Sequence, residues 1–168
     1  MVMAVSPVLA LYGGLYHWYP SVTGRMLDDR LGKIHFWITF IGTYLIYFPM
    51  HYIGFLGVPR RYYSNEQYDF IPQSVNDLNQ FITICALIVG AAQFILLYNF
   101  IVSIFKGKKA GSNPWGACTL EWQALESPPG HGNWDVQLPV VHRWPYDYGL
   151  PGATADFVPQ NVADEDIT

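Results

Sequence analysis

Two adjacent arginines, Arg60 and Arg61, are the residues whose type and spacing first indicate chemistry in this sequence. They follow directly on the apolar stretch "FLGVP". A guanidinium is a planar fork of donors that binds a carboxylate or a phosphate through two hydrogen bonds at once. Charges at the end of an apolar run can instead serve only as membrane anchors that reach lipid headgroups. The pair is therefore a candidate anion-binding site or a membrane anchor.

A metal site within the chain is not expected, because its histidines and cysteines lack the spacing of metal ligands. His17, His35 and His51 are 18 and 16 residues apart, so no two of them share a helix face at i, i+4. Cys85 and Cys118 form no Cys-x-x-Cys pair and suggest no disulfide. There is also no glycine-rich phosphate loop, nucleophile elbow, internal repeat or basic patch for nucleic acid. We therefore assign no catalytic and no metal-binding residue.

The composition is that of a membrane protein with an acidic tail. Of the 168 residues, 51% are hydrophobic and only 13% are charged, whereas soluble proteins have about 25% charged residues. Residues 1–109 hold eight of the nine Lys and Arg and five of the thirteen Asp and Glu, and residues 110–168 hold one basic and eight acidic residues. This asymmetry predicts a transmembrane helical region at 1–109 and an extramembrane tail at 110–168.

Three uncharged runs in the first region are long enough to cross a bilayer, which needs about 20 helical residues. The first begins at Met1, the second fills the 26 positions between Lys33 and Arg60, and the third the 28 positions between Asp77 and Lys106. They predict an all-α membrane protein with three transmembrane helices at about 1–19, 34–58 and 78–105.

The orientation of these helices follows from the basic residues in the short flanks, which concentrate on the inner side. The loop between the first two spans holds Arg25, Arg30 and Lys33, and three lysines follow the third span. The loop between the second and third spans holds only Arg60 and Arg61. We therefore expect the first loop and the tail inside and the arginine pair outside, where topology does not require it.

Polar side chains in the spans or at their edges are expected to hydrogen-bond neighbouring helices rather than to face lipid. These residues are His17, His35, His51, Gln80, Gln93 and Asn99. Asp28 and Asp29 lie in the inner loop with Arg25 and Arg30. We expect these two acids to be solvated or salt-bridged, and a role in proton uptake is the alternative.

The tail holds seven of the twelve prolines and four tryptophans, Trp115, Trp122, Trp134 and Trp144. Disordered segments are poor in aromatic residues. This Pro- and Trp-rich tail is therefore expected to be an extended strap that lies on a protein surface, with only the final "NVADEDIT" left free.

The ordered set of motifs resembles subunit I of the haem–copper terminal oxidases. The segments "GKIHFW", "FPMHYIG" and "GVPRRY" are similar to the eleventh helix of that subunit and its flanks, and "NPWGACTLEWQALESPPGHGNW" is similar to its C-terminal strap. The stretch "VVHRWPYDYGLPGA" looks more like bacterial relatives. The resemblance covers nearly the whole chain and implies helices ten to twelve of subunit I with an inner-side tail.

This resemblance implies part of the catalytic subunit of a cytochrome-c oxidase, which reduces oxygen to water and couples the reaction to proton translocation. The implied cofactors are two haems and copper B of the complete subunit. The implied partners are the remaining N-terminal part of subunit I, subunits II and III, cytochrome c and membrane lipid. The expected location is a bacterial inner membrane, ahead of the mitochondrial inner membrane.

The resemblance also gives the arginine pair a role, since Arg60 and Arg61 match adjacent arginines that reach the propionates of both haems on the outer side. It places the haem-binding His-x-His pair just before Met1 and the other metal ligands on earlier helices, so the chain is expected to be a truncated gene product or half of a split subunit. A quinol oxidase subunit I and a small non-catalytic accessory membrane subunit are the alternatives.

Overall fold

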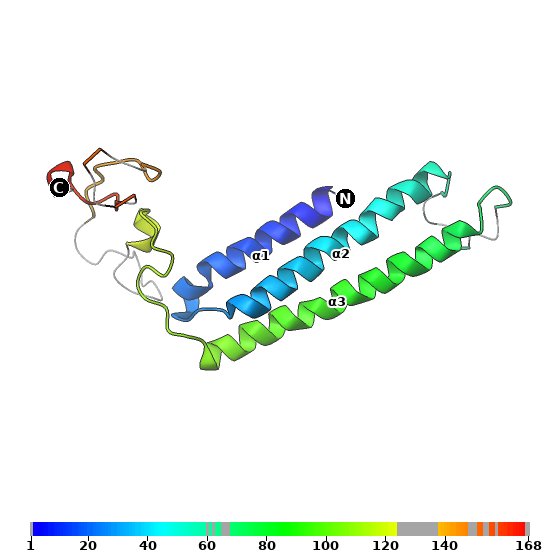
Figure 1. Ribbon diagram of the computed structural model, residues 1–168, viewed down its shortest axis with the longest axis horizontal. Coiled ribbons are helices and arrows are strands. Elements are labelled where there is room, and N and C mark those ends of the chain that lie inside the picture. Colours follow the sequence, from blue (N-terminus) through cyan, green and yellow to red (C-terminus); the bar gives the residue numbers. More distant parts are fainter. Residues whose placement is uncertain are drawn as a thin grey trace. The chain divides into compact units, whose positions relative to one another are not determined.

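The computed structural model describes residues 2–59, 61, 63–64, 68–123, 138–147, 151–152, 155–156 and 158–166. Three long helices dominate (Figure 1), namely α1 (Val2–Thr23), α2 (Asp29–Phe55) and α3 (Ser74–Lys106). Two short 3-10 helices follow in the tail, η2 (Leu120–Trp122) and η3 (Asp164–Asp166). Within the described residues there is no β-strand, only an isolated bridge between Arg25 and Lys109. The prediction of an all-α chain is confirmed to this extent.

Helix α1 continues to Thr23, past the end of the expected span at residue 19. It stops where Gly24 adopts a left-handed backbone with φ +68° and its N–H donates to the carbonyl of Pro20 at 2.9 Å. Glycine takes this conformation without steric penalty, which makes it the usual residue after a helix end. The end of the helix is therefore set by a glycine and not by the last residue of the apolar run.

Helix α2 begins before its uncharged run because two acids stabilise its first turn. The carboxylate of Asp28 accepts a hydrogen bond from the N–H of Leu31 at 3.0 Å and so caps the helix. The carboxylate of Asp29 lies 2.6 Å from Nζ of Lys33, four residues further along an exposed face. The two acids thus act in a cap and a salt bridge, and the ion-pair partner is Lys33.

The contacts within the chain form two units. The first consists of Met1–Leu11 and Asp28–Val102, and the second of Tyr12–Leu27 and Ser103–Thr168. These units are defined by contacts within the chain. The predicted boundary at residue 109, between a membrane region and a tail, is defined by composition. The contacts do not test it, and it stays a prediction.

In the first unit, α2 and α3 lie side by side and run in opposite directions (Figure 1). Near the end of α3, Asn99 hydrogen-bonds the backbone of Asp28 at the start of α2. Near the start of α3, Val75 packs with Ile53 from the end of α2. The helix pair is therefore fixed at both ends.

The two helices are in close contact at Gly42 of α2. A Cβ atom built on Gly42 would lie 2.2 Å from Cγ2 of Val89 on α3. A side chain at this position would have to displace a β-branched residue, whose rotamers are few. Glycine is therefore required here by packing.

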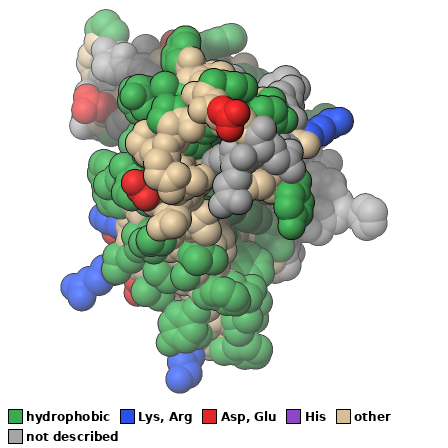
Figure 2. Space-filling model, turned by 90° about the vertical axis from the view of Figure 1, so that its right-hand side faces the viewer, with side chains coloured by type: hydrophobic (Ala, Val, Ile, Leu, Met, Phe, Trp, Pro, Cys, Tyr) green, Lys and Arg blue, Asp and Glu red, His purple; other side chains and the backbone are tan. Residues whose placement is uncertain are grey.

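Among the described residues, only α3 is both long and apolar enough to cross a membrane by hydropathy, with a mean of 2.3 in its most apolar window. Helix α2 is uncharged after Lys33, but its tyrosines, histidines, threonines and glycines lower its mean hydropathy. Large hydrophobic side chains remain exposed on α3, including Leu87 at 69% and Phe94 at 71%. Figure 2, which views the molecule from the right-hand side of Figure 1, shows hydrophobic side chains over much of that face. A surface of this kind suits lipid or further helices.

Candidate functional site

The arginine pair follows a tight turn that ends α2. The N–H of Leu56 donates to the carbonyl of Tyr52, and the N–H of Gly57 donates to that of Gly54, both at 3.1 Å. Gly57 has φ +85°, a left-handed conformation that stops the helix. The expected span to residue 58 therefore ends earlier, at Phe55, because the chain leaves the helix through this glycine.

A small apolar core holds the turn in place. Its buried residues are Ile53, Val75 and Ile82, and Leu56 and Val58 of the turn pack against it. Val58 precedes Pro59, and a residue before proline is restricted to extended backbone. The backbone that leads to the arginines is thus fixed on one side by packing and on the other by proline.

Arg61 lies exposed after this turn, with a left-handed backbone of φ 59°. This conformation is uncommon for a residue other than glycine and is often found at functional sites. In the part of the chain that the structure describes, Lys33 pairs with Asp29 and the imidazole of His17 lies near the carboxylate of Glu121, and Arg61 takes part in neither contact. Its guanidinium is available to an anion from outside these residues. Arg60 lies outside the described residues.

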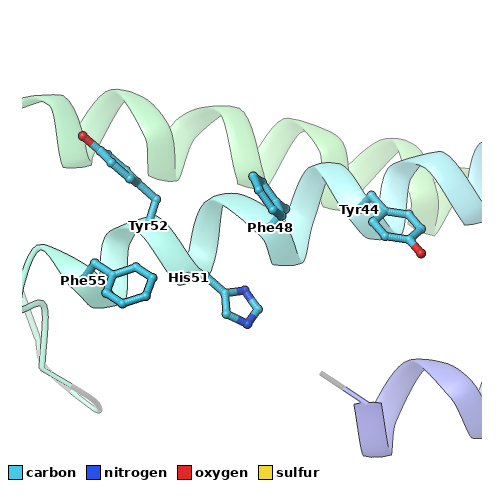
Figure 3. A pocket seen from close by; sticks show the side chains of 5 residues that line it. All are labelled: Tyr44, Phe48, His51, Tyr52 and Phe55. Carbon is cyan, nitrogen blue, oxygen red and sulfur yellow. The ribbon is translucent and has the colours of Figure 1, made fainter.

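One face of α2 carries an open hollow of about 400 Å³ before the turn. Figure 3 shows the five side chains that line it, Tyr44, Phe48, His51, Tyr52 and Phe55. Four of them recur at intervals of four, three and four residues, which places them on one helix face. This hollow was not predicted, although the spacing of Tyr44, Phe48 and Phe55 in the sequence could have indicated an aromatic helix face.

His51 was expected to bond a neighbouring helix, and this prediction is wrong. Its Nδ1 lies 2.8 Å from the carbonyl oxygen of Tyr47, one turn earlier in the same helix. Because a carbonyl oxygen can only accept, Nδ1 of His51 is the donor in this bond. The bond remains within α2 because His51 is exposed.

His35 and Gln93 do connect neighbouring helices, as expected. His35 is only 1% exposed, and its Nε2 lies 3.1 Å from Oε1 of Gln93 on α3. The amide nitrogen of Gln93 donates to Oγ1 of Thr39 on α2 at 3.3 Å and to the carbonyl of Val89 at 2.9 Å. These bonds satisfy the buried polar groups between two apolar helices, so His35 has a structural role here.

In the second unit, the start of the tail packs on the end of α1 through aromatic rings. The ring of Trp115 stacks on His17 at a centroid distance of 6.0 Å, and the ring of Trp122 meets His17 edge-on at 5.1 Å. Trp122 is buried, with 4% exposed. The strap prediction is supported for these two tryptophans, whereas Trp144 is 66% exposed and Trp134 lies outside the described residues.

Gln160 holds the later part of the tail together, which the sequence did not indicate. Its backbone N–H donates to the carbonyl of Cys118 at 3.1 Å, and its Oε1 accepts from the N–H of Leu120 at 3.1 Å. Its carbonyl accepts from the N–H of His142 at 2.9 Å, and its Nε2 donates to the carbonyl of Arg143 at 3.2 Å. One buried amide thus joins three separate stretches of the tail.

No group of three or more His, Cys, Asp or Glu side chains comes together among the residues that the structure describes. Arg61 is exposed among the described residues, and a guanidinium can bind a carboxylate.

Comparison with known proteins defines the class of this chain. The sequence profile of the family described as "Cytochrome C and Quinol oxidase polypeptide I" matches residues 1–88. The matched part is more than half of the chain and includes Arg60 and Arg61. The chain belongs to this family of haem–copper oxidase subunits.

Individual relatives have the same character. The chain is 61% identical over 161 residues, 96% of its length, to the alternative cytochrome c oxidase subunit 1 of Bradyrhizobium diazoefficiens. It is 49% identical over 143 residues, 85% of its length, to cytochrome c oxidase subunit 1 of Thermostichus vulcanus. It is also 39% identical over 142 residues, 84% of its length, to the heme-copper oxidase subunit I+III of Aeropyrum pernix.

These relatives are much longer than the chain, which covers 27%, 24% and 16% of them. The chain thus spans about a quarter or less of their length. The match to the Bradyrhizobium protein extends through most of the tail, because only 7 of the 168 residues lie outside it. The recognition of the chain as part of an oxidase subunit I is confirmed.

Proposed function

We propose that this chain is part of the catalytic subunit of a respiratory haem–copper oxidase. The complete enzyme would take electrons from cytochrome c, reduce oxygen to water and couple the reaction to proton translocation. Its partners would be the remaining N-terminal part of subunit I and subunits II and III. Family membership and the names of the relatives support this proposal.

The proposal includes three transmembrane helices, with a transmembrane region at 1–109 and the tail at 110–168 on the inner side. The six-to-two distribution of basic residues between the two sides supports this orientation. The exposed apolar side chains of α3 support a membrane or helical environment for that helix. The bacterial relatives favour a bacterial inner membrane.

Arg60 and Arg61 would hold haem propionates on the outer side. The observation that carries this assignment is Arg61, exposed on a fixed turn and not engaged by an acid among the described residues. A propionate is a carboxylate, which suits the planar guanidinium. The haems, when bound, carry electrons to oxygen, and the arginines of this chain orient the propionates and add positive charge beside them.

A quinol oxidase subunit I is the second candidate, because the matched family includes quinol oxidases. It would use the same arginines and differ in the electron donor. An unrelated accessory subunit is disfavoured by the 61% identity to an oxidase subunit 1.

The assignment predicts that Arg61 raises the haem midpoint potential, because a nearby cation stabilises the reduced haem. Two unit charges about 10 Å apart at an effective dielectric of about 20 interact by roughly 1.7 kcal/mol. For a one-electron couple this is about 70 mV, and solvent could halve it. Arg61→Asn should lower the potential by tens of millivolts, and Arg61→Lys by less, since it keeps the charge.

The measurement is a redox titration of both haems in the complete enzyme. Asparagine is the informative replacement, because it tolerates the left-handed backbone of Arg61. Arg30→Gln is the matched control, since it removes an exposed arginine from the opposite flank of α2. If Arg61→Asn assembles and leaves both potentials at the wild-type values, Arg61 is a membrane anchor and the assignment is wrong.

A further inference from the structure

Four side chains surround His17 near the end of α1, all of them within the second unit. The imidazole stacks on Trp115 and meets Trp122 and Trp18 edge-on, with the Trp18 centroid at 5.5 Å. Nε2 of His17 lies 3.6 Å from Oε1 of Glu121 in η2. A half-exposed histidine thus contacts three indole rings and one carboxylate.

Hydrogen bonds that do not depend on protonation of His17 also join the end of α1 to residues 115–122 of the tail. The indole N–H of Trp18 donates to Oε1 of Glu121. The indole N–H of Trp115 donates to the backbone carbonyl of His17 at 3.1 Å. The contact between His17 and Glu121 differs from both, because it becomes an ion pair only when the imidazole is charged.

We propose that this cluster is a pH-sensitive latch that holds the strap segment 115–122 on the end of α1 more tightly when His17 is protonated. Histidine changes charge between about pH 5 and 8, and the resulting cation gains the carboxylate of Glu121 as its partner. An imidazolium also interacts more favourably with aromatic rings than a neutral imidazole does. The side chains of His17 and Glu121 are 45% and 46% exposed, so protons reach them from water.

Glu121 is the titratable group that the described residues bring to His17. The other residues in contact with the His17 ring are Trp18, Trp115 and Trp122, and tryptophan side chains do not titrate. Cys118 lies in the strap between two of them, and burial raises the pKa of its thiol, so it stays neutral up to pH 8. The charge change of the latch therefore comes from His17.

The direction of the effect follows from this chemistry. The ion pair requires a protonated imidazole and an ionised carboxylate, so it weakens as the pH rises through the range of about 5 to 8 in which histidine side chains lose their charge. A half-exposed ion pair contributes at most about 1 kcal/mol, which is about a fivefold change in an equilibrium constant. Opening of the strap should therefore be less frequent at pH 5.5 than at pH 8, by up to about fivefold.

The test is amide hydrogen exchange of the full chain, purified from membranes with its bound subunits. The N–H of Trp122 donates to the carbonyl of Thr119, and that of Gln123 to Leu120, both at 3.0 Å, so these amides report on η2. Protection factors, taken relative to an unstructured peptide at each pH, remove the pH dependence of exchange itself. Wild-type protection should be higher at pH 5.5 than at pH 8, by up to about fivefold.

Three variants make the test specific. Glu121→Gln keeps an acceptor for Trp18 and should abolish the pH dependence, and His17→Gln should abolish it independently. Glu165→Gln removes an exposed acid of the same unit outside the cluster and should preserve the dependence. A flat wild-type profile, or one that persists in either Glu121→Gln or His17→Gln, would overturn the proposal.

Discussion

Replacement of Asn99 by leucine should destabilise the pair of helices α2 and α3. Asn99 is 1% exposed, and its Oδ1 accepts from the backbone N–H of Asp28 while its Nδ2 donates to the carbonyl of Asp28, both at 3.0 Å. Asp28 is the residue that caps α2. Leucine has a similar size but can form neither bond, so the cap loses its attachment to α3.

The two bonds do not contribute equally. The carbonyl of Asp28 also accepts from the N–H of Gly32 at 3.0 Å, so it keeps a partner in the variant. The N–H of Asp28 has Asn99 as its acceptor in the described residues, in a partly buried bond, and a donor that loses its partner costs about 1–3 kcal/mol where water does not replace it. Side-chain bonds between membrane helices average less, about 0.6 kcal/mol. We expect a loss of about 1–3 kcal/mol, because the partner here is a backbone group.

The assay is unfolding of the purified chain in detergent micelles with increasing SDS, followed by helical circular dichroism. Gln80→Leu is the matched control, since it removes a side-chain amide from an exposed position of the same helix and should change the free energy of unfolding by at most about 0.5 kcal/mol. The reasoning fails if Asn99→Leu unfolds at the wild-type SDS fraction, or if Gln80→Leu costs as much.

Two further predictions concern packing and topology. Gly42→Ala places a Cβ against Val89 and should cost about 1–3 kcal/mol in the same unfolding assay. Val89→Ala should recover most of that loss in the double variant, whereas Gly54→Ala, which meets open space on the same helix, should cost nothing; equal losses at Gly42 and Gly54 would contradict the packing argument. In a background without Cys85 and Cys118, a cysteine at Ser112 should react with an impermeant thiol reagent only from the inner side of sealed vesicles, and one at Asp69 only from the outer side. Labelling of position 112 from outside would exclude the proposed topology.

The sequence predicted those features that depend on local chemistry or on the total amount of apolar surface. Uncharged runs located the helices, and the tryptophans of the tail indicated a strap that needs a surface. Helix ends were less accurate, because Gly24 and Gly57 stop the helices through their backbone and not at the end of an apolar run. The hydrogen bond between His35 and Gln93 could not be predicted from the sequence, because it depends on how α2 and α3 are aligned.

The residues missed by the sequence analysis have roles that become visible only in three dimensions. Gln160 is one residue in a loop-rich tail, yet it bonds to two other stretches, 118–120 and 142–143, that are far from it in the sequence. His35 and His51 lie near opposite ends of α2, and the first is buried against α3 whereas the second is exposed. Residue type alone could not separate these cases.

The contacts between α2 and α3 also bear on the arginine turn, which lies at the opposite end of α2 from Asn99. A slip of α2 by one helical turn would move the turn by about 5.4 Å. If the charge distance grew from about 10 to about 15 Å, the interaction of Arg61 with a haem would fall by about a third. The Asn99 bonds, the Gly42 contact and the Ile53 core all oppose such a slip. The position of Arg61, which we propose holds a haem propionate, therefore depends on contacts along the whole length of the helix pair and not on the turn alone.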